Sequence, residues 1–388
     1  MERLRVGIVG GGPAGACAAW QAARLGHEAT FFDHRAPWEK PCGGGITVKA
    51  QDDFPWIAEI ASLGRAVREF RFLSPEDRTV EFTCPRETLI FARATFDEEV
   101  RRRAIAAGAT RVARKVQRIE RQAGGWRLTA QGETYHFDFL VGADGAISIV
   151  RETLVPDFRG FRNSIASGFF IPAAIERIET KFFGDARGYL WFFPRPDHLS
   201  VGLCLWGGEG AALGRETRAR LIDLLAEYFP ALDPRTGKGY GAFIPTIMDP
   251  ACWKVARGGP DWALVGDAGG FVDTITGEGI YYALRSARAW GRALADGAPE
   301  TYDRIWRSEF GDELEKASRL VHLYYRPRFI EEVVRFGAAS AVIRAVLADL
   351  VMGTQSYRTL RRRLQREILC AGWRRMTGWR RRVRLAVG

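Results

Sequence analysis

The alternation of apolar and polar positions predicts the first elements of the chain. A short, mostly apolar run spans residues 4–9, apolar residues then recur every three to four positions, and a second apolar run ends at Asp33. An apolar run fits a buried strand, and the wider spacing fits a helix packed on one face. The first 33 residues therefore predict a strand, a helix and a second strand of an α/β sheet.

The pattern changes after residue 154. Short β-rich runs, among them YLWFFP, HLSVGLCLW and GYGAFIP, are separated by Gly, Pro and Asp, which is typical of an antiparallel sheet. Between them, GRETRARLIDLLAEYFP predicts an amphipathic helix. Its apolar side consists of Leu221, Leu224, Leu225 and Phe229. The last ninety residues read as mostly helical.

These elements predict an α/β fold with an α+β insertion. We expect a discontinuous, Rossmann-like dinucleotide-binding domain at residues 1–153 and 255–298. A substrate domain built on an antiparallel sheet would occupy residues 154–254, and a helical region with a basic tail would follow at 299–388. A chain of 388 residues is long enough for such packed units.

Composition indicates a globular protein whose positive charge lies at one end. The chain is 47% hydrophobic and 27% charged. The net charge of the whole chain is +11, and residues 355–388 alone hold eleven arginines and one glutamate. The six cysteines show no CxxC or zinc spacing, and we find no secretory leader or long apolar run. We therefore expect a cytoplasmic protein without a metal site or a membrane-spanning helix.

The segment GIVGGGPAGA carries the clearest motif. Gly10 permits a tight turn after the first strand, Gly12 lets backbone N–H groups approach a pyrophosphate, and Gly15 allows close packing of the helix on the strand. The helix N-terminus offers unpaired amides to the phosphates. Asp33 is placed to accept hydrogen bonds from a ribose. The motif predicts a dinucleotide site but does not distinguish FAD from a nicotinamide.

Two later strands end in similar chemistry. FLVGADG places Asp144 and Gly145 after an apolar strand, and WALVGDAGG places Asp267 after another, before a Gly-Glu-Gly-Ile turn into a helix. Such a carboxylate can be aimed at the ribityl chain and phosphates of FAD, and the helix N-terminus can face the pyrimidine end of the flavin. A plain strand-turn-helix unit is the alternative.

In this order the motifs resemble those of FAD-dependent enzymes with the aromatic hydroxylase fold. Four further segments are similar to the geranylgeranyl reductase family: KPCGGGI (40–46), FARATFDEEVRRRA (91–104), YLWFFPRPDHLSVGL (189–203) and MGTQSYRTLRRRL (352–364). The resemblance runs from residue 5 to about 365. It implies that the protein is an FAD-dependent oxidoreductase.

The resemblance also implies contacts to the cofactor. It puts Ala14 and Asp33 on the adenosine half of FAD, Val116 beside the adenine, Cys42 near the isoalloxazine, and Arg93 on the pyrophosphate, where a guanidinium can bind two oxygens. The complete expected cofactor site is Gly10, Gly12, Pro13, Ala14, Gly15, Asp33, His34, Cys42, Gly43, Gly44, Gly45, Arg93, Val116, Asp144, Gly145, Asp267, Gly277, Gly279 and Ile280.

The implied reaction is saturation of carbon–carbon double bonds in a geranylgeranyl or polyprenyl chain on a lipid or related isoprenoid. Reduced flavin can deliver a hydride from N5 while a proton reaches the neighbouring carbon. Tyr189 and Trp191 lie two apart on a predicted strand, point the same way and offer π faces to developing positive charge. The electron donor, NAD(P)H or a ferredoxin-like protein, stays open.

Two other function classes remain. One is a flavin-dependent monooxygenase or halogenase of the same fold, although KPCGGGI stands where halogenases carry a different loop. The other is a flavoprotein that passes electrons or binds lipid without transforming it.

Cys42 completes the candidate catalytic residues, with Tyr189 and Trp191. Its thiol is interpreted as a proton source or a polarizable wall for the alkene, with simple packing beneath the flavin as the alternative.

The arginine-rich tail predicts contact with an anionic membrane surface on the inner face of a membrane. Its apolar positions near one helical face are Leu360, Leu364, Ile368, Met376, Trp379 and Val383. Gly372 and Gly378 are expected to interrupt one long helix. A solvated basic helix and an acidic protein partner are the alternatives, and no nucleic-acid motif accompanies the charge.

Overall fold

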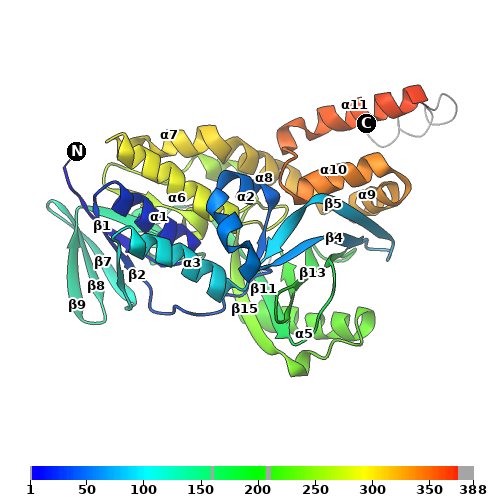
Figure 1. Cartoon of the computed structure of the whole chain (residues 1–388), viewed down its shortest axis with the longest axis horizontal. Helices are drawn as coiled ribbons and strands as arrows, with labels where there is room; N and C mark the ends of the chain where they lie inside the picture. Colours follow the sequence, from blue (N-terminus) through cyan, green and yellow to red (C-terminus); the bar gives the residue numbers. More distant parts are fainter. Residues whose placement is uncertain (1, 159–160, 207–210, 375–388) are drawn as a thin grey trace.

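A computed structural model describes residues 2–158, 161–206 and 211–374, which form an elongated molecule with two main sheets (Figure 1). A small three-stranded sheet lies at one end of the molecule and the last helices lie at the other. The predicted mixture of a parallel sheet, an antiparallel insertion and C-terminal helices is confirmed.

Five of the described strands form a parallel sheet in the order β16-β10-β1-β2-β6. They are β1 (Arg5–Val9), β2 (Glu28–Phe32), β6 (Thr110–Val112), β10 (Phe139–Gly142) and β16 (Trp262–Leu264). Helix α1 (Pro13–Arg24) packs on this sheet between α3 (Arg93–Ala106) and α6 (Ile280–Ala295). The predicted strand, helix and strand of the first 33 residues are thus β1, α1 and β2.

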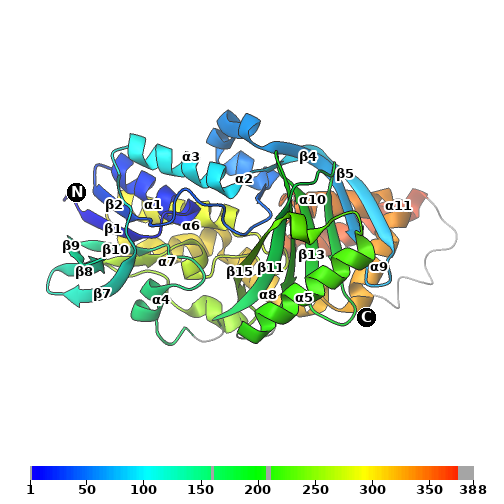
Figure 2. The same cartoon turned by 90° about the horizontal axis from the view of Figure 1, so that it is seen from below.

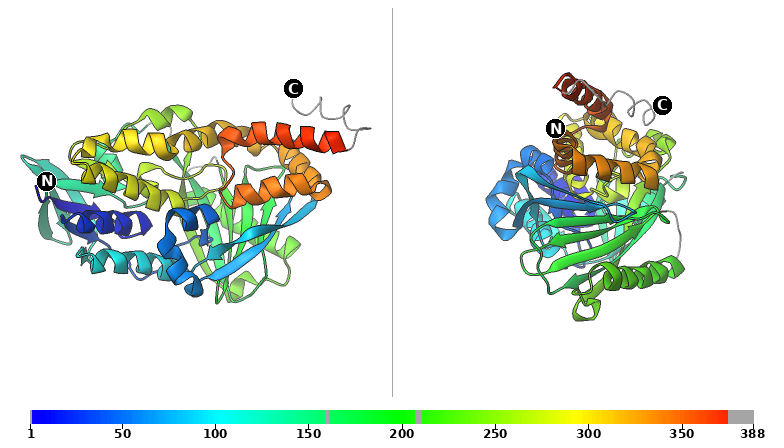
Figure 3. Two further views of the ribbon diagram at one scale, coloured as in Figure 1. Left: turned by 45° about the horizontal axis from the view of Figure 1, so that its top comes forward. Right: turned by 90° about the vertical axis from the view of Figure 1, so that its right-hand side faces the viewer.

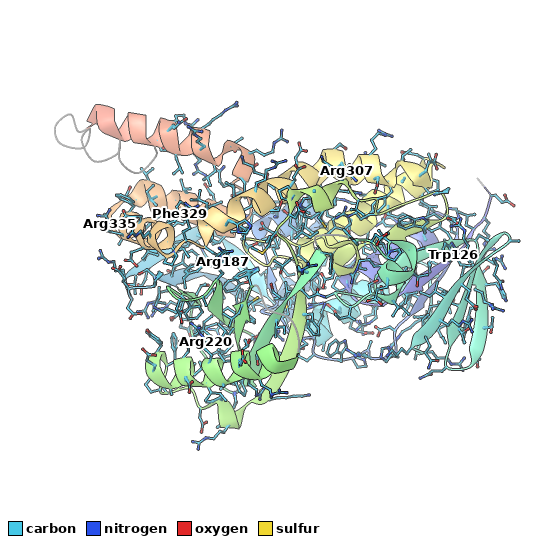
Figure 4. The ribbon with its side chains drawn as sticks, turned by 180° about the vertical axis from the view of Figure 1, so that it is seen from behind. Trp126, Arg187, Arg220, Arg307, Phe329 and Arg335 are labelled. Atoms are coloured by element: carbon cyan, nitrogen blue, oxygen red, sulfur yellow. The ribbon has the colours of Figure 1, made fainter. Side chains whose placement is uncertain are left out.

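A three-stranded antiparallel sheet extends the molecule beyond the parallel one. It consists of β7 (Val116–Gln122), β8 (Gly125–Ala130) and β9 (Glu133–Phe137). Trp126 of β8, labelled in Figure 4, is buried in a core shared with the parallel sheet. The short helix α4 (Ile149–Leu154) follows β10.

Eight other strands of the described chain form a second, mainly antiparallel sheet in the order β15-β11-β14-β13-β12-β4-β5-β3. From residues 45–90 come β3 (Gly45–Ile46), β4 (Arg65–Leu73) and β5 (Thr79–Ile90). The others are β11 (Phe161–Ile171), β12 (Ile178–Phe182), β13 (Gly188–Pro194), β14 (Leu199–Leu205) and β15 (Lys238–Ile247). The predicted division into domains assigned 45–90 to the dinucleotide-binding unit, whereas these strands pair with the substrate sheet.

Alternation along β13 decides what each face of the second sheet contacts. Leu190 and Phe192 are buried in a core with Leu221 and Leu225 of α5 (Ala211–Tyr228), the predicted amphipathic helix. The intervening aromatic residues of β13 point to the opposite face. Figure 2 shows α5 crossing its side of the sheet.

The C-terminal helices cover the other face of the second sheet, opposite α5 (Figure 3). They are α8 (Asp312–Tyr324), α9 (Pro327–Ala339), α10 (Ala341–Val351) and α11 (Tyr357–Arg374). The short helix α7 (Tyr302–Trp306) packs instead on α6, and α2 (Val48–Asp53) lies earlier in the chain. In Figure 4, Arg220 on α5 and Arg335 on α9 mark these opposite sides.

The expected interruption at Gly372 is wrong, because Gly372 lies inside α11. Leu360 and Leu364 of α11 are partly buried. Gly378 and the apolar positions Met376, Trp379 and Val383 lie outside the described residues, and the side chain of Ile368 is likewise not described. In the described ranges, no helix combines the length and apolar character that crossing a bilayer requires.

The contact between α5 and the sheet generates a stability prediction. Leu221→Ala removes a side chain that is 0% exposed, and we expect the free energy of unfolding to fall by about 2–5 kcal/mol. Ile222→Ala alters the neighbouring residue, which is 41% exposed, and we expect a change within about 0.5 kcal/mol. Urea unfolding of both variants measures the difference, and equal losses would contradict the packing of α5.

Candidate active site

One cavity of about 550 Å³ joins the two main sheets. It extends from the N-terminus of α1 past β13 to the start of α11. Of the residues predicted from the sequence, those in its wall are Gly12, Pro13, Ala14, Cys42, Gly43, Gly44, Gly45, Arg93, Gly145, Tyr189, Trp191, Asp267, Gly277, Gly279 and Ile280. The predicted residues in the wall lie at the α1 end and around β13, and none lies at the α11 end.

The three motif glycines have different surroundings. A Cβ atom on Gly10, where φ is +104°, would lie 2.3 Å from the Ala143 carbonyl oxygen, and one on Gly15 would lie 1.9 Å from the Gly10 oxygen. These two glycines permit the turn and the close packing of α1. A Cβ on Gly12 would meet no atom within 4 Å, and no side chain caps α1. Gly12 and the helix N-terminus therefore leave room for a phosphate.

Asp33 and its neighbours lie outside the cavity wall. Asp33 Oδ1 accepts hydrogen bonds from the amides of Arg35 and Ala36, and a Cβ on Gly11 would lie 2.6 Å from Asp33 Oδ2. His34 is exposed. Val116 is 4% exposed and packs in the core beneath the three-stranded sheet.

Arg101 is a residue that the sequence analysis missed beside Asp33. Its guanidinium is buried, with Nη1 3.1 Å from the Gly11 carbonyl oxygen and 3.5 Å from Asp33 Oδ2. Its Nη2 has no hydrogen-bond partner among the described residues. A buried donor without a partner beside the glycine turn fits an anionic or hydroxylated ligand.

The loop of Cys42 is held from the second sheet. Arg195 and Ser200 both donate hydrogen bonds to the carbonyl oxygen of Cys42, and Arg195 also pairs with Glu39. Glu39 accepts from the first amides of α3, Arg93 N and Ala94 N, at 2.8 and 3.0 Å. Arg195 and Glu39 were not singled out in the sequence, because charged residues in a loop carry no spacing signal.

Each glycine after Cys42 meets a bulky neighbour. Cβ atoms on Gly43 and Gly45 would lie 2.9 and 3.0 Å from the ring of Phe193. Gly44 has φ +84°, and its Cβ would lie 2.1 Å from the carbonyl oxygen of Phe91. The free thiol of Cys42 accepts a hydrogen bond from the Gly44 amide at 3.3 Å. The loop thus requires glycine for close approach on both sides.

Arg93 lines the cavity but is already paired. Asp97 accepts two hydrogen bonds from its guanidinium, at 2.8 and 2.9 Å. Burial lowers the pKa of Arg93, but Asp97 and Cys42 outweigh it and the pKa is raised overall. A pyrophosphate would therefore share this cation with Asp97, and the predicted contact stays a prediction.

Asp144 lies outside the cavity wall and contacts the N-terminus of α4, whose N-cap residue is Ser148. It accepts hydrogen bonds from the Ser148 hydroxyl and, at 3.3 Å, from the Val150 amide. Burial raises the pKa of Asp144 to about 6. The adjoining Gly145 does line the cavity.

Asp267 and the following glycine turn face the Cys42 loop. Lys40 Nζ lies 3.3 Å from Asp267 Oδ2, and a Cβ on Gly279 would lie 3.4 Å from Asp267 Oδ1. Helix α6 begins at Ile280 without a side-chain cap. A Cβ on Gly277 would lie 2.6 Å from the hydroxyl oxygen of Tyr189, so the turn and β13 meet there.

An aromatic wall forms the side of the cavity nearest the second sheet. The rings of Tyr189 and Trp191 lie 5.8 Å apart at 59°, which confirms that they share a face of β13. Trp191 fits because its neighbour on β14 is Gly202, where a Cβ would lie 2.1 Å from the indole. Tyr324 and Tyr325 of the C-terminal region complete this wall.

Two pairs of ionisable groups stand out among the wall residues that were not predicted as site residues. Lys49 Nζ pairs with Glu278 at 2.6 Å, and Tyr357 donates a hydrogen bond to Asp273 at 3.0 Å. The segment that contains Tyr357 was noted in the sequence, but the partners lie 229 and 84 residues apart in the chain. Only the folded chain brings them together.

Comparison with known proteins gives a consistent result. A family profile described as an NAD(P)-binding Rossmann-like domain matches residues 8–49. Geranylgeranyl diphosphate reductase of Rhodobacter capsulatus is 33% identical over 306 residues, covering 75% of this chain and 74% of that protein. Menaquinone reductase of Mycolicibacterium smegmatis is 28% identical and covers 90% of this chain and 91% of that protein.

The fold also matches a solved structure. A geranylgeranyl bacteriochlorophyll reductase-like protein from Thermoplasma acidophilum superposes with a TM-score of 0.72 at 20% identity. The match covers 94% of this chain and 99% of that one.

The Gly44 turn generates a prediction with a matched control. Gly44 and Gly26 both have φ +84°, but a Cβ on Gly26 would meet no atom within 4 Å. We expect Gly26→Ala to lower the free energy of unfolding by about 1–2 kcal/mol, the cost of a left-handed backbone. Gly44→Ala should cost more, because its Cβ also strikes the Phe91 carbonyl. Urea unfolding compares them, and a Gly44→Ala loss no larger than that of Gly26→Ala would count against the close approach.

Proposed function

Because this chain belongs to the geranylgeranyl reductase family of FAD-dependent oxidoreductases, we propose that it saturates carbon–carbon double bonds of a prenyl chain bound along the aromatic wall of its cavity. The observation that carries the proposal is the cavity itself. A single space connects the glycine turn of α1, the Cys42 loop and the rings of Tyr189 and Trp191. A cofactor and an apolar chain could therefore meet inside it.

The residues at one end fit FAD. The open space at Gly12 and the uncapped N-termini of α1 and α6 offer donors and room for the phosphates and riboses. The unpartnered Nη2 of Arg101 lies behind this end, outside the cavity wall. Gly277 and Gly279 would lie against the flavin. When bound and reduced, FAD supplies the hydride for the reaction.

The other end fits an isoprenoid. Tyr189, Trp191 and Tyr325 present ring faces, which exclude water and stabilise positive charge developing on an alkene carbon. An unactivated double bond has no polar group that the protein could bind, so holding the alkene in position is the main contribution that the protein can make. The head group, a diphosphate, a lipid or a quinone, is left open by the relatives' different substrates.

Cys42 is proposed to border the reacting alkene. Its carbonyl is fixed by Arg195 and Ser200, so the thiol position is set by the backbone. Whether the thiol gives a proton or forms a polarizable wall, Cys42→Ser tests it: full prenyl reduction by an FAD-loaded variant would remove the thiol from the mechanism.

A variant of the aromatic wall tests the proposed function. The holoenzyme is reduced anaerobically and mixed with geranylgeranyl diphosphate or a geranylgeranyl lipid, and product mass is followed. We expect a gain of two hydrogens per double bond. Trp191→Leu should slow product formation about 10-fold, because loss of a π face costs about 1–2 kcal/mol.

Trp126→Phe is the control, since Trp126 is buried in the remote three-stranded sheet. It should keep the parent rate at equal FAD content. A product that depends on oxygen or halide would instead indicate a monooxygenase or halogenase.

We further propose that α11 rests on an anionic membrane surface, from which a lipid substrate would enter. Arg361, Arg362 and Arg366 are exposed on α11. The electron donor, NAD(P)H or a ferredoxin-like protein, is likewise a proposal, and product formation with each donor distinguishes them.

Charge removal tests the membrane proposal. The triple variant R361Q/R362Q/R366Q should bind anionic vesicles roughly 10²-fold more weakly, at about 1 kcal/mol per basic residue. The control R102Q/R118Q/R235Q removes the same charge from exposed positions elsewhere and should leave binding unchanged. Co-sedimentation with vesicles measures both, and parallel behaviour of the two variants would refute a role of α11.

A further inference from the structure

Saturating a double bond takes a proton as well as a hydride, and tyrosines are one class of cavity-wall group, besides the Cys42 thiol, that could hold it. Seven tyrosines line the cavity in the described chain: Tyr189, Tyr240, Tyr281, Tyr282, Tyr324, Tyr325 and Tyr357. The partners of their hydroxyl groups separate them. A carbonyl partner fixes a hydroxyl but cannot resupply its proton, whereas a carboxyl partner can.

Three of these hydroxyl groups donate to backbone carbonyls. Tyr189 donates to Thr276 at 2.9 Å, Tyr325 to Ile275 at 2.6 Å and Tyr240 to Val201 at 3.0 Å. These contacts orient the rings, but the backbone carbonyl oxygens that accept them hold no proton to return.

Tyr281 donates to a carboxylate that is unsuited to resupplying a proton. Its partner Asp53 lies outside the cavity wall and pairs with Arg285 and Arg288. Burial opposes ionisation of Asp53, but Tyr281 and the two arginines prevail and its pKa is lowered. Asp53 therefore stays ionised.

Tyr357 and Asp273 differ from these four tyrosines and their partners. Both line the cavity, and the Tyr357 hydroxyl donates to Asp273 Oδ2 at 3.0 Å. Asp273 Oδ1 accepts from the amides of Ile275 and Thr276, so its two oxygens have separate tasks. Burial raises the pKa of Asp273, against the opposing influence of Lys49.

The pair is held from both sides. The carboxylate of Glu313 on α8 accepts hydrogen bonds from the Tyr357 amide and the Ser356 hydroxyl, each at 2.6 Å, which fixes the start of α11. Asp273 is tied to the glycine turn, because its carbonyl accepts from the Gly277 amide at 2.8 Å. The turn proposed to face the flavin therefore carries the carboxyl group with it.

We propose that Asp273 and Tyr357 deliver the proton that completes reduction of the double bond, an inference that rests on the proposed function. When Asp273 is protonated on Oδ2, it donates to the Tyr357 oxygen, the reverse of the hydrogen bond described above, and the Tyr357 O–H is free to point at the alkene. The O–H bond of Tyr357 then breaks as its proton bonds to one alkene carbon, while the other carbon would receive the hydride that bound, reduced FAD supplies. The carboxyl proton of Asp273 moves to the phenol oxygen, and solvent then protonates the Asp273 carboxylate. Reduced FAD, when bound, would supply the two electrons with the hydride, so that the alkene gains two electrons and two hydrogens in all.

Two conservative variants test the pair. Tyr357→Phe removes only the hydroxyl, and Asp273→Asn keeps an oxygen for the amides of Ile275 and Thr276. In single turnovers of the reduced holoenzyme with geranylgeranyl diphosphate or a geranylgeranyl lipid, each should slow formation of saturated product by about 10²-fold. Oxidation of the same reduced flavin by ferricyanide, which protonates no carbon, should keep the parent rate.

The double variant separates a relay from two independent losses. It should be no slower than the slower single variant, because groups that act as a unit are not additive. Tyr325→Phe is the matched control, since it removes a hydroxyl held by the same loop without touching a carboxyl group. Its rate gives the cost of losing a loop contact.

The relay would be overturned if the single variants formed product no more slowly than Tyr325→Phe. It would also be overturned if the two rate losses multiplied in the double variant, or if oxidation by ferricyanide slowed equally. An active parent with active variants overturns this inference alone. A parent that saturates no prenyl substrate overturns the proposed function and the relay with it.

Discussion

The site depends on one buried cation, the guanidinium of Arg195. Its side chain is fully buried, follows β13 in the second sheet, and holds the Cys42 carbonyl while pairing with Glu39. Glu39 in turn occupies the N-terminus of α3, where the helix dipole also favours a negative charge. Breaking such a pair leaves an uncompensated buried charge, which costs about 3–5 kcal/mol. The loop, the helix and the aromatic strand are therefore fixed together.

This arrangement explains how an apolar cavity coexists with many charges. The basic groups in its described wall are Lys40, Lys49 and Arg93, and each has a carboxylate partner. Pairing lets these residues be buried without a free charge facing the prenyl chain. In the proposed function, the aromatic rings of β13 would then meet the substrate, and the ion pairs would position the loops around it.

Much of the fold and of the cofactor end could be predicted from the sequence, because those signals are local. Gly10, Gly12 and Gly15 lie within six residues, and the alternation along β13 placed Tyr189 and Trp191 on one face. Arg195, Arg101 and Asp273 could not be found this way, since their partners are distant in the chain. The membership of β4 and β5 in the second sheet has the same cause: pairing with β12 is set by tertiary packing and not by the alternation of either strand.

The two-residue strand β3 attaches the Cys42 loop to the second sheet. Gly45 and Ile46 pair with Ile90 and Leu89 of β5, so the loop is the edge of the second sheet although it follows the first in sequence. Any small rotation of one sheet against the other would keep Cys42 in register with the aromatic strand. The same rotation would change its separation from the glycine turn of α1. In the proposed function, the thiol would thus move with the sheet that contacts the isoprenoid, and the Glu39 contact with α3 would limit how far its distance from the cofactor changes.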